Sequence, residues 1–257
     1  MSSIVYGPVP SWRLGRSLGI DLLSTPGKTC SFDCIYCQLG PTVHPLTERR
    51  EFVSLQQVSE ELEAAKGTAA DCVTFSGLGE PTLASNLAQA ISLARSVYDL
   101  PVAVLTNSSL MPRAEVRRDL EAVDVVVAKL DAPDDGLLRS VNRPVGDCSI
   151  GDIVEGIRTF REVYRGKLAI QMMFVEVNKH SARQMAEMVR SLSPDEVQLN
   201  TPLRPCAVEP LSAEDMDAIK GEFHGLNVVQ VYQTEAPVVA PLSVSEVRRR
   251  RPESPQV

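Results

Sequence analysis

Short apolar runs rich in β-branched residues alternate with longer amphipathic stretches along this chain, and that alternation limits the folds open to it. Each run is too short for a buried helix and has the composition of a strand. After residue 50 the runs are CVTFSG (72–77), VAVLTN (102–107), VDVVVAKLDA (123–132), LAIQMMFVE (168–176) and EVQLN (196–200). Strands that alternate with helices predict right-handed βαβ units and a parallel sheet.

The stretches between the runs carry helix start signals. These are Ser54 before Gln57, Asp152 before Glu155, Ser181 before Gln184 and Ser212 before Asp215. Each pair resembles a capping box, in which the first residue caps the helix and the residue three positions later bonds back to it. Behind the caps, apolar residues at helical spacing, such as Ile153, Ile157 and Phe160, predict helix faces turned toward a core.

The motif SLGIDLL (17–23) supplies one more strand, which makes six β/α units, two short of a closed eight-stranded barrel. We therefore predict an α/β fold, a partial (β/α)6 TIM-like barrel with parallel strands. The core domain is expected to span residues 1–223 without an internal linker. Residues 224–257 are expected to form a short C-terminal extension, with an extra strand at 228–232 and a disordered tail.

Charge and hydropathy exclude several classes of protein. The formal net charge is −7, so no general field attracts nucleic acid. No run approaches the roughly 20 apolar residues of a membrane helix. The opening MSSIVYGPVPSW lacks the apolar region of a secretory signal. We expect a cytoplasmic protein with no membrane partner, and a solvated arginine run at 248–251 that keeps the tail disordered.

Half of the six cysteines, Cys30, Cys34 and Cys37, fall within eight positions in KTCSFDCIYCQLG. In a reducing compartment, clustered cysteines more often hold a metal or do redox chemistry than form disulfides. This loop follows the first strand, and parallel β/α folds gather their chemistry at the carboxyl ends of the strands. Three thiolates are one fewer than an electron-transfer iron–sulfur cluster usually receives, which leaves a position open for catalysis. A zinc site completed by His44, or a disulfide, is the alternative.

Two motifs carry a resemblance to the radical S-adenosylmethionine (SAM) superfamily. CSFDCIYC matches its CxxxCxΦC loop, with Tyr36 as the aromatic residue, and FSGLGEP (75–81) resembles its Gly-Gly-Glu motif, which binds the methionine amino group. The opening YGPVPSWRLGRSLGIDLL is similar to uncharacterised iron–sulfur oxidoreductases related to wyosine-tRNA synthases. A partial (β/α)6 barrel is the usual fold of the superfamily, so the resemblance covers most of the chain.

The resemblance implies a [4Fe–4S] cluster and S-adenosyl-L-methionine as cofactors. Cys30, Cys34 and Cys37 would bind three irons, and the amino and carboxylate groups of S-adenosylmethionine would chelate the fourth. One electron from a donor such as flavodoxin or ferredoxin would cleave the sulfonium and give a 5′-deoxyadenosyl radical. That radical would take a hydrogen atom from a polar substrate, so the chain would be an iron–sulfur oxidoreductase.

The resemblance also implies which residues bind S-adenosylmethionine. They are Tyr36, Gly77, Gly79, Glu80, Asn107 and Asp131. Tyr36 would pack near the adenine, and Glu80 would bind the methionine amino group. Leu78 departs from the family motif, because it is an extra residue between the two glycines.

Strand alternation predicts a polar interior for the barrel. If Asp131 points inward, Lys129 does too, because side chains two apart share a face of a strand. The same register places further polar residues inside, namely Thr74, Ser76, Asn107, Gln171, Gln198 and Asn200. Such a lumen suits a polar substrate, since buried polar groups need partners. Lys129 and Asp131 are the candidate catalytic residues. Lys129 would pair with Asp131, bind the cofactor carboxylate or form a Schiff base with a carbonyl substrate.

Other functions stay open. An iron–sulfur electron carrier or sensor would use the same thiolates, but it has no need to bind an amino acid moiety. A tRNA-modifying enzyme is disfavoured by the acidic charge, and Cys72, Cys148 and Cys206 lack the spacing of a second cluster. Basic residues around the barrel mouth, with Arg13 and Arg16 nearby, would favour it. A zinc-stabilised binding module is the third alternative.

Overall fold

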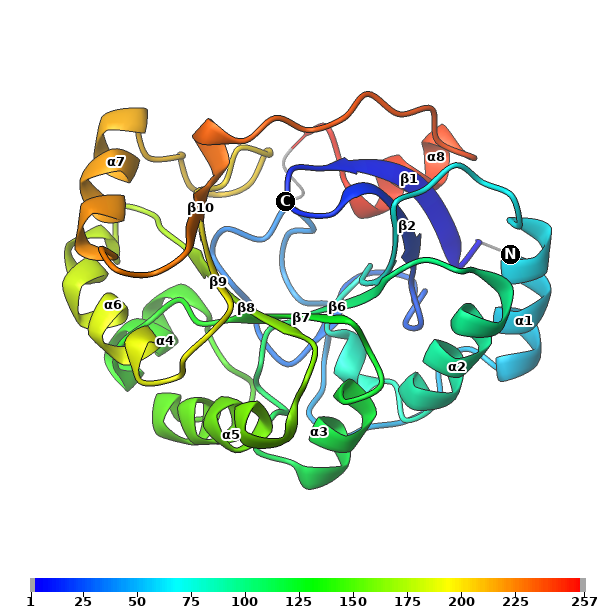
Figure 1. The fold of residues 1–257 in the computed structure, drawn as a ribbon, viewed down its shortest axis with the longest axis horizontal. Coiled ribbons are helices and arrows are strands. Elements are labelled where there is room, and N and C mark those ends of the chain that lie inside the picture. Colours follow the sequence, from blue (N-terminus) through cyan, green and yellow to red (C-terminus); the bar gives the residue numbers. More distant parts are fainter. Residues whose placement is uncertain (1–2, 255–257) are drawn as a thin grey trace.

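The computed structural model describes residues 3–254, and its main feature is a curved sheet of eight strands (Figure 1). Across the sheet they are β1 (Val5–Ser11), β2 (Gly15–Ile20), β5 (Cys72–Phe75), β6 (Val102–Thr106), β7 (Val125–Lys129), β8 (Lys167–Met173), β9 (Glu196–Asn200) and β10 (Val228–Gln230). The β1–β2 pair is antiparallel and the other pairings in this sheet are parallel. The edge strands β1 and β10 do not pair with each other in the described chain, so the sheet is a half-barrel with one open side.

Helices cover the convex face of the half-barrel (Figure 1). They are α1 (Leu55–Ala64), α2 (Leu87–Val97), α3 (Ala114–Leu120), α4 (Asp135–Val141), α5 (Ile150–Val163), α6 (Ala182–Arg190) and α7 (Ala213–Glu222). Ser54 and Ser212 cap their helices as predicted, whereas Ser181 begins α6 without a side-chain bond. Asp152 is not a cap, because Ser149 Oγ accepts from the Asp152 backbone N–H at 3.1 Å and starts α5 one turn earlier. Within residues 3–254 no helix is long and apolar enough to cross a membrane.

The predicted partial barrel is confirmed, with an additional strand in front of it. Strand β1 is absent from the prediction, because Pro8 and Pro10 in GPVP indicate a loop. In the structure β1 is an edge strand, where proline is tolerated, and its register against β2 shifts between Tyr6 and Val9. The extra strand predicted at 228–232 is present as the shorter β10.

The two faces of the sheet differ as the alternation predicts. Residues that face the helices join one hydrophobic core, among them Val73, Phe75, Val104, Val126, Ile170, Val197 and Leu199. Their neighbours Thr74, Gln171 and Gln198 are buried on the concave face. The register places Lys129 beside Gln171 and Gln171 beside Gln198. Val127 lies on the same face, so the lumen is mixed in character with a polar row near its carboxyl end.

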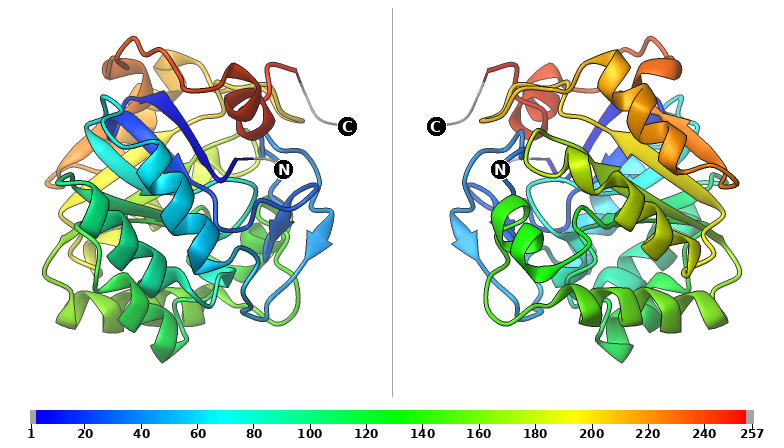
Figure 2. Two further views of the ribbon diagram at one scale, coloured as in Figure 1. Left: turned by 90° about the vertical axis from the view of Figure 1, so that its right-hand side faces the viewer. Right: turned by 90° about the vertical axis from the view of Figure 1, so that its left-hand side faces the viewer.

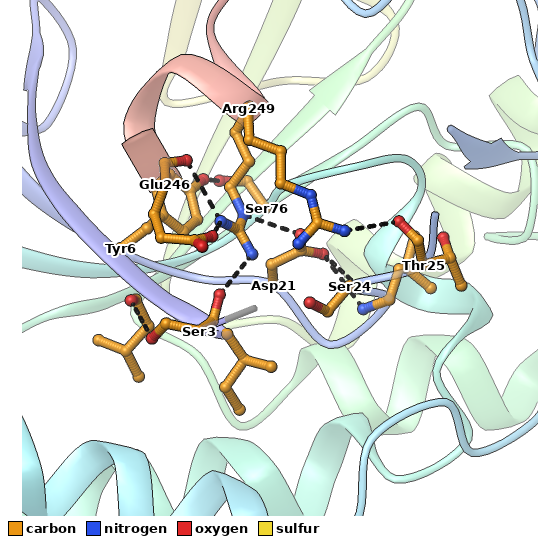
Figure 3. Close-up of polar contacts among 12 residues, drawn as sticks. Ser3, Tyr6, Asp21, Ser24, Thr25, Ser76, Glu246 and Arg249 are labelled. Atoms are coloured by element: carbon orange, nitrogen blue, oxygen red, sulfur yellow. Dashed lines mark hydrogen bonds and ion pairs between the residues drawn. The ribbon is translucent and has the colours of Figure 1, made fainter. Parts of the chain in front are cut away.

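The C-terminal arginine run is ordered. Residues 244–250 form α8 (Val244–Arg250), which packs on β1, and the Arg250 side chain is 1% exposed. Arg250 Nε donates to Asp21 Oδ2 at 2.8 Å, Nη1 to Glu246 Oε2 at 2.7 Å and Nη2 to Ser3 O at 2.7 Å. Figure 3 shows Asp21, Glu246 and Ser3 turned toward this one centre. The prediction of a solvated run is therefore wrong for Arg250, while the domain boundary at residue 223 stays a prediction.

Helix α8 also forms hydrogen bonds with the loop that carries the clustered cysteines. Arg249 Nη2 donates to Thr25 O at 2.9 Å (Figure 3), and Gln38 Nε2 donates to Arg250 O at 2.9 Å. Asp21 Oδ1 accepts from the backbone N–H of Ser24 at 3.1 Å. Helix α8 thus contacts the chain at Thr25, before the clustered cysteines, and at Gln38, after them. Asp21 connects these contacts to the end of β2.

We expect Arg250→Met to lower the free energy of unfolding by about 3–5 kcal/mol, because it leaves the Asp21 carboxylate buried and unpaired. The double variant Asp21→Asn/Arg250→Met should recover part of this loss. Denaturant unfolding of the full chain measures both. Arg248→Met is the matched control, since Arg248 is 60% exposed and should change stability by less than about 0.5 kcal/mol. Equal stabilities for the Arg250 and Arg248 variants would contradict the role of the buried pair.

Candidate active site

The clustered cysteines lie in a loop of residues 24–50, here called the cysteine loop, at the carboxyl end of the half-barrel (Figure 2). Within it β3 (Thr29–Cys30) pairs with β4 (His44–Pro45). Thr29 N donates to Leu78 O at 2.9 Å, and Glu80 N donates to Thr29 O at 3.2 Å. Leu78 and Glu80 belong to residues 76–80 after β5, here called the glycine loop. The two sequence motifs therefore form one backbone contact.

The glycines of the glycine loop let its backbone lie very close to the cysteine loop and to the Asp21 side chain. A Cβ on Gly79 would lie 1.6 Å from Thr29 O, and a Cβ on Gly77 would lie 2.2 Å from Asp21 Cγ. Any side chain at either position would therefore displace the cysteine loop or Asp21. Leu78, the residue that departs from the family motif, is buried and supplies the carbonyl for Thr29.

The three thiols of the cysteine loop lie around Lys28. This lysine is 3% exposed, and its Nζ lies 3.7 Å from Asp33 Oδ1 and 3.3 Å from Gly40 O. Burial lowers the pKa of Lys28, but the nearby Cys37, Cys30 and Cys34 more than offset this and raise it above its ordinary value. Lys28 was not a predicted site residue, although its place two positions before Cys30 is a local signal.

Two side-chain amides contact the thiols. Asn107 Nδ2 lies 3.5 Å from Cys30 Sγ, and Asn142 Nδ2 lies 3.4 Å from Cys34 Sγ. Burial raises the pKa of Cys30 to about 12, although Lys28 acts in the opposite direction. Binding to a metal requires the thiolate, so metal binding at this site must displace protons.

The structure does not bring the ligands of a Cys₃His zinc site together. Among residues 3–254, no three His, Cys, Asp or Glu side chains are grouped so that they could hold one metal ion. His44 is exposed, with Nε2 3.1 Å from Pro26 O. A single zinc ion needs four ligands at about 2.0–2.3 Å from one point.

Glu80 connects the glycine loop to the end of β6. Its carboxylate is 2% exposed and accepts from Thr82 N and Oγ1, from Thr106 Oγ1 and from Asn107 N. Burial raises the pKa of Glu80, and these hydrogen bonds act in the opposite direction. The carboxylate predicted to bind a cofactor thus also orders the loop and positions Asn107.

Tyr36, Lys129 and Asp131, predicted from separate parts of the sequence, meet in the structure. Tyr36 Oη donates to Asp131 Oδ2, and Lys129 Nζ lies 3.7 Å from Asp131 Oδ2 and 4.7 Å from the Tyr36 ring centroid. Asp131 Oδ1 accepts from Met173 N at 2.7 Å. Asn142 Nδ2 donates to Asp131 at 2.8 Å, and its position after α4 carries no motif that marks it in the sequence.

The remaining cysteines do not form a second cluster in the described chain, and all six thiols are free. Cys72 is buried at the start of β5, at the amino end of the sheet. Cys148 lines a cavity of about 170 Å³ beside Ser31. Cys206, in the loop after β9, packs against a small apolar cluster that contains Tyr36 and Val175.

Matches to a family model and to known relatives cover most of this chain. A model of the radical SAM superfamily matches residues 24–189. A UPF0026 protein of Methanocaldococcus jannaschii is 41% identical over 79% of this chain and 64% of that protein. A UPF0026 protein of Synechocystis sp. is 38% identical over 82% of this chain and 78% of that protein. The chain therefore spans less than two thirds of the length of the first relative.

The fold is similar to that of SuiB from Streptococcus suis bound to S-adenosylmethionine. The TM-score is 0.63 at 15% sequence identity, over 82% of this chain and 50% of that chain. SuiB is also known bound to its precursor peptide SuiA. At this identity the likeness concerns the fold.

We expect Gly79→Ala to destabilise the chain by more than about 2 kcal/mol, because its Cβ would overlap Thr29 O. Gly221→Ala is the matched control. Gly221 lies in α7 with no atom within 4 Å of an added Cβ, so alanine should leave stability unchanged or raise it by up to about 1 kcal/mol. Thermal unfolding compares the two variants, and a Gly79 variant as stable as the Gly221 variant would refute the contact.

Cys72 should react slowly with iodoacetamide in the native protein, because burial raises the pKa of its thiol from an ordinary value of 9.0 to about 11. At neutral pH that difference leaves about a hundredfold less thiolate than in a free thiol. Mass spectrometry of the alkylated chain, with N-acetylcysteine as the reference thiol, measures the rate. Labelling of Cys72 as fast as the reference would show that it is accessible and ionised.

Proposed function

The chain belongs to the radical SAM superfamily and, within it, to the UPF0026 proteins; on that premise we propose that it is an enzyme that cleaves S-adenosylmethionine reductively and abstracts a hydrogen atom from a polar substrate. Radical SAM proteins use a [4Fe–4S] cluster and S-adenosylmethionine. The observation that carries the proposal is that the radical SAM model matches residues 24–189, which include Cys30, Cys34 and Cys37 and the two amides that contact thiols of this loop.

The thiols suit a [4Fe–4S] cluster better than a single ion. A cube of four irons takes each thiolate at a different corner, so the sulfurs need not converge on one point. Cys30, Cys34 and Cys37 would hold the cluster, which when bound would supply the electron that cleaves the sulfonium of S-adenosylmethionine.

Lys28 and the two amides would set the electrostatics around the thiolates. Three thiolates bring negative charge into a buried region, and the ammonium of Lys28 offsets part of it. Asn107 and Asn142 would donate to the sulfurs of Cys30 and Cys34. Hydrogen bonds to ligand sulfurs are among the factors that set the reduction potential of a cluster.

We propose that S-adenosylmethionine is bound by the residues that the sequence motifs imply. Glu80, with the backbone of Gly77 and Gly79, would bind the methionine amino group in exchange for one of the hydrogen bonds that Glu80 now accepts, such as that from Thr82. The remaining contacts would come from Tyr36, Asn107 and Asp131. Lys129, which is 20% exposed beside Asp131, would bind the cofactor carboxylate or a polar substrate.

The substrate is proposed to be polar, because Lys129, Gln171 and Gln198 line the concave face. SuiB, which shares the fold, is known with a bound peptide, so a peptide is one class of substrate to test. Flavodoxin or ferredoxin is the proposed reductant. A cytoplasmic location, the relation to wyosine-tRNA synthases and action on tRNA stay predictions.

The test is an anaerobic assay of the full chain. After cluster reconstitution and reduction, S-adenosylmethionine is added and 5′-deoxyadenosine is measured. We expect the nucleoside from the wild type and from Cys72→Ala, and none from the Cys30/Cys34/Cys37→Ala variant, which should also lose its bound iron. A reduced cluster that gives no nucleoside, with or without candidate substrates, would favour an electron carrier. A colourless protein that binds zinc would favour the binding module.

A further inference from the structure

The buried Arg250 of α8 reaches the glycine loop through Asp21. Arg250 Nε donates to Asp21 Oδ2 at 2.8 Å, and both side chains are 1% exposed. The carboxyl group of Asp21 in turn lies against Gly77, since a Cβ added to Gly77 would lie 2.2 Å from Asp21 Cγ. Asp21 follows β2 and Gly77 follows β5, so this contact is at the carboxyl end of the sheet. The glycine loop therefore packs on a carboxylate that the C-terminal helix holds in place.

A second connection from Arg250 to the glycine loop runs through Tyr6. The Arg250 guanidinium lies 4.5 Å from the centroid of the Tyr6 ring, where the face of the ring attracts a cation. Tyr6 Oη forms a 2.9 Å hydrogen bond with Ser76 Oγ (Figure 3). Ser76 is the first residue of the glycine loop, so the two connections end at adjacent residues, Ser76 and Gly77.

The same helix is connected to the cysteine loop. Asp21 Oδ1 accepts from Ser24 N at 3.1 Å, where this loop begins. Arg249 Nη2 donates to Thr25 O at 2.9 Å (Figure 3), and Thr25 Oγ1 lies 2.7 Å from Thr29 Oγ1. Thr29 precedes the first of the clustered cysteines and exchanges backbone hydrogen bonds with the glycine loop. Asp21 and α8 thus contact both of the loops that would hold the cofactors.

Arginine is the side chain that these contacts require at position 250. Its three nitrogens donate to different partners, Nε to Asp21, Nη1 to Glu246 Oε2 at 2.7 Å and Nη2 to Ser3 O at 2.7 Å. A lysine would carry the same charge on a single nitrogen and would not reproduce this planar fork. A buried ion pair often adds no more stability than apolar side chains of the same volume, but it can specify a single arrangement of the groups around it.

We propose that Arg250 is a positioning residue for S-adenosylmethionine, because through Asp21 and Tyr6 it fixes the glycine loop relative to the cysteine loop. This inference rests on the proposed function, in which the glycine loop binds the methionine amino group and the clustered cysteines hold the cluster.

The consequence for binding follows from the order that Arg250 imposes. With Asp21 and Tyr6 held in place, the backbone of Ser76 and Gly77 is ordered before the cofactor arrives. Without those contacts the glycine loop would have to be ordered when S-adenosylmethionine binds, which lowers affinity. The clustered cysteines themselves are untouched by this change, so the cluster should still bind.

Amide hydrogen exchange of the full chain, without cluster or S-adenosylmethionine, is the first measurement. Arg250→Lys and Tyr6→Phe should raise exchange in residues 22–30 and 76–80 by about threefold more than in α5, as expected for the loss of a buried hydrogen bond. Arg248→Met is the matched control, because Arg248 is 60% exposed on the same helix, and it should leave both loops unchanged. A role in global stability alone would raise exchange in α5 as much as in the loops.

Equilibrium dialysis of S-adenosylmethionine against the reconstituted, oxidised full chain is the second measurement, since no reductant is present to cleave the cofactor. Arg250→Lys should weaken binding by about tenfold or more and Tyr6→Phe by about threefold, with the iron content of the wild type. The double variant Asp21→Asn/Arg250→Met, which should recover part of the stability, should still bind weakly because the Gly77 contact is no longer held. Arg248→Met should bind like the wild type.

Faster exchange in the two loops, together with weaker cofactor binding at unchanged iron content, supports the proposal. It is overturned if the loops exchange no faster than α5, if the variants bind S-adenosylmethionine like the wild type, or if they lose iron, which would indicate a role in cluster binding. Tyr6→Phe decides the outcome if Arg250→Lys does not fold. A wild type that binds no S-adenosylmethionine would overturn the proposed function as well, whereas binding that the variants retain would overturn this inference alone.

Discussion

The backbone contact between Thr29 and the glycine loop is the connection on which the candidate active site depends. Thr29 exchanges hydrogen bonds with Leu78 and Glu80, which makes the cysteine loop an extension of the sheet. Only a residue without a Cβ fits at Gly79. The carboxylate of Glu80 then binds the backbone of Asn107 at the end of β6, so the thiols, the glycine loop and two strand ends are held as one unit.

The sequence was sufficient to predict the fold, and it singled out the cysteine loop as the candidate site. Strand and helix periodicities are local properties, and the parallel half-barrel follows from their alternation. The spacing of Cys30, Cys34 and Cys37 identified the loop. Alternation along the run 123–132 predicted that Lys129 and Asp131 share the inner face, and their ion pair bears this out. Strand β1 escaped prediction because proline signals a loop locally, whereas an edge strand tolerates it.

The residues that complete the site depend on long-range contacts that no local pattern encodes. Asn142 reaches Cys34 and Asp131 from a turn after α4. Arg250 reaches Asp21 across 229 positions, and no rule of charge patterning separates one buried arginine from a solvated run. Gly77 and Gly79 were predicted to bind S-adenosylmethionine; they also let two segments of the chain approach each other, and spacing alone does not separate these uses.

The edge strand β1 has a further consequence for how the molecule meets others. Pro8 and Pro10 provide no N–H, and the carbonyls of Gly7 and Pro10 accept from Leu242 N and Arg251 Nη1 of the C-terminal segment. An unpaired edge normally templates the addition of a foreign strand, which is a common route to aggregation. Here that edge has few groups left to offer, so the addition of a strand that would complete the barrel is discouraged.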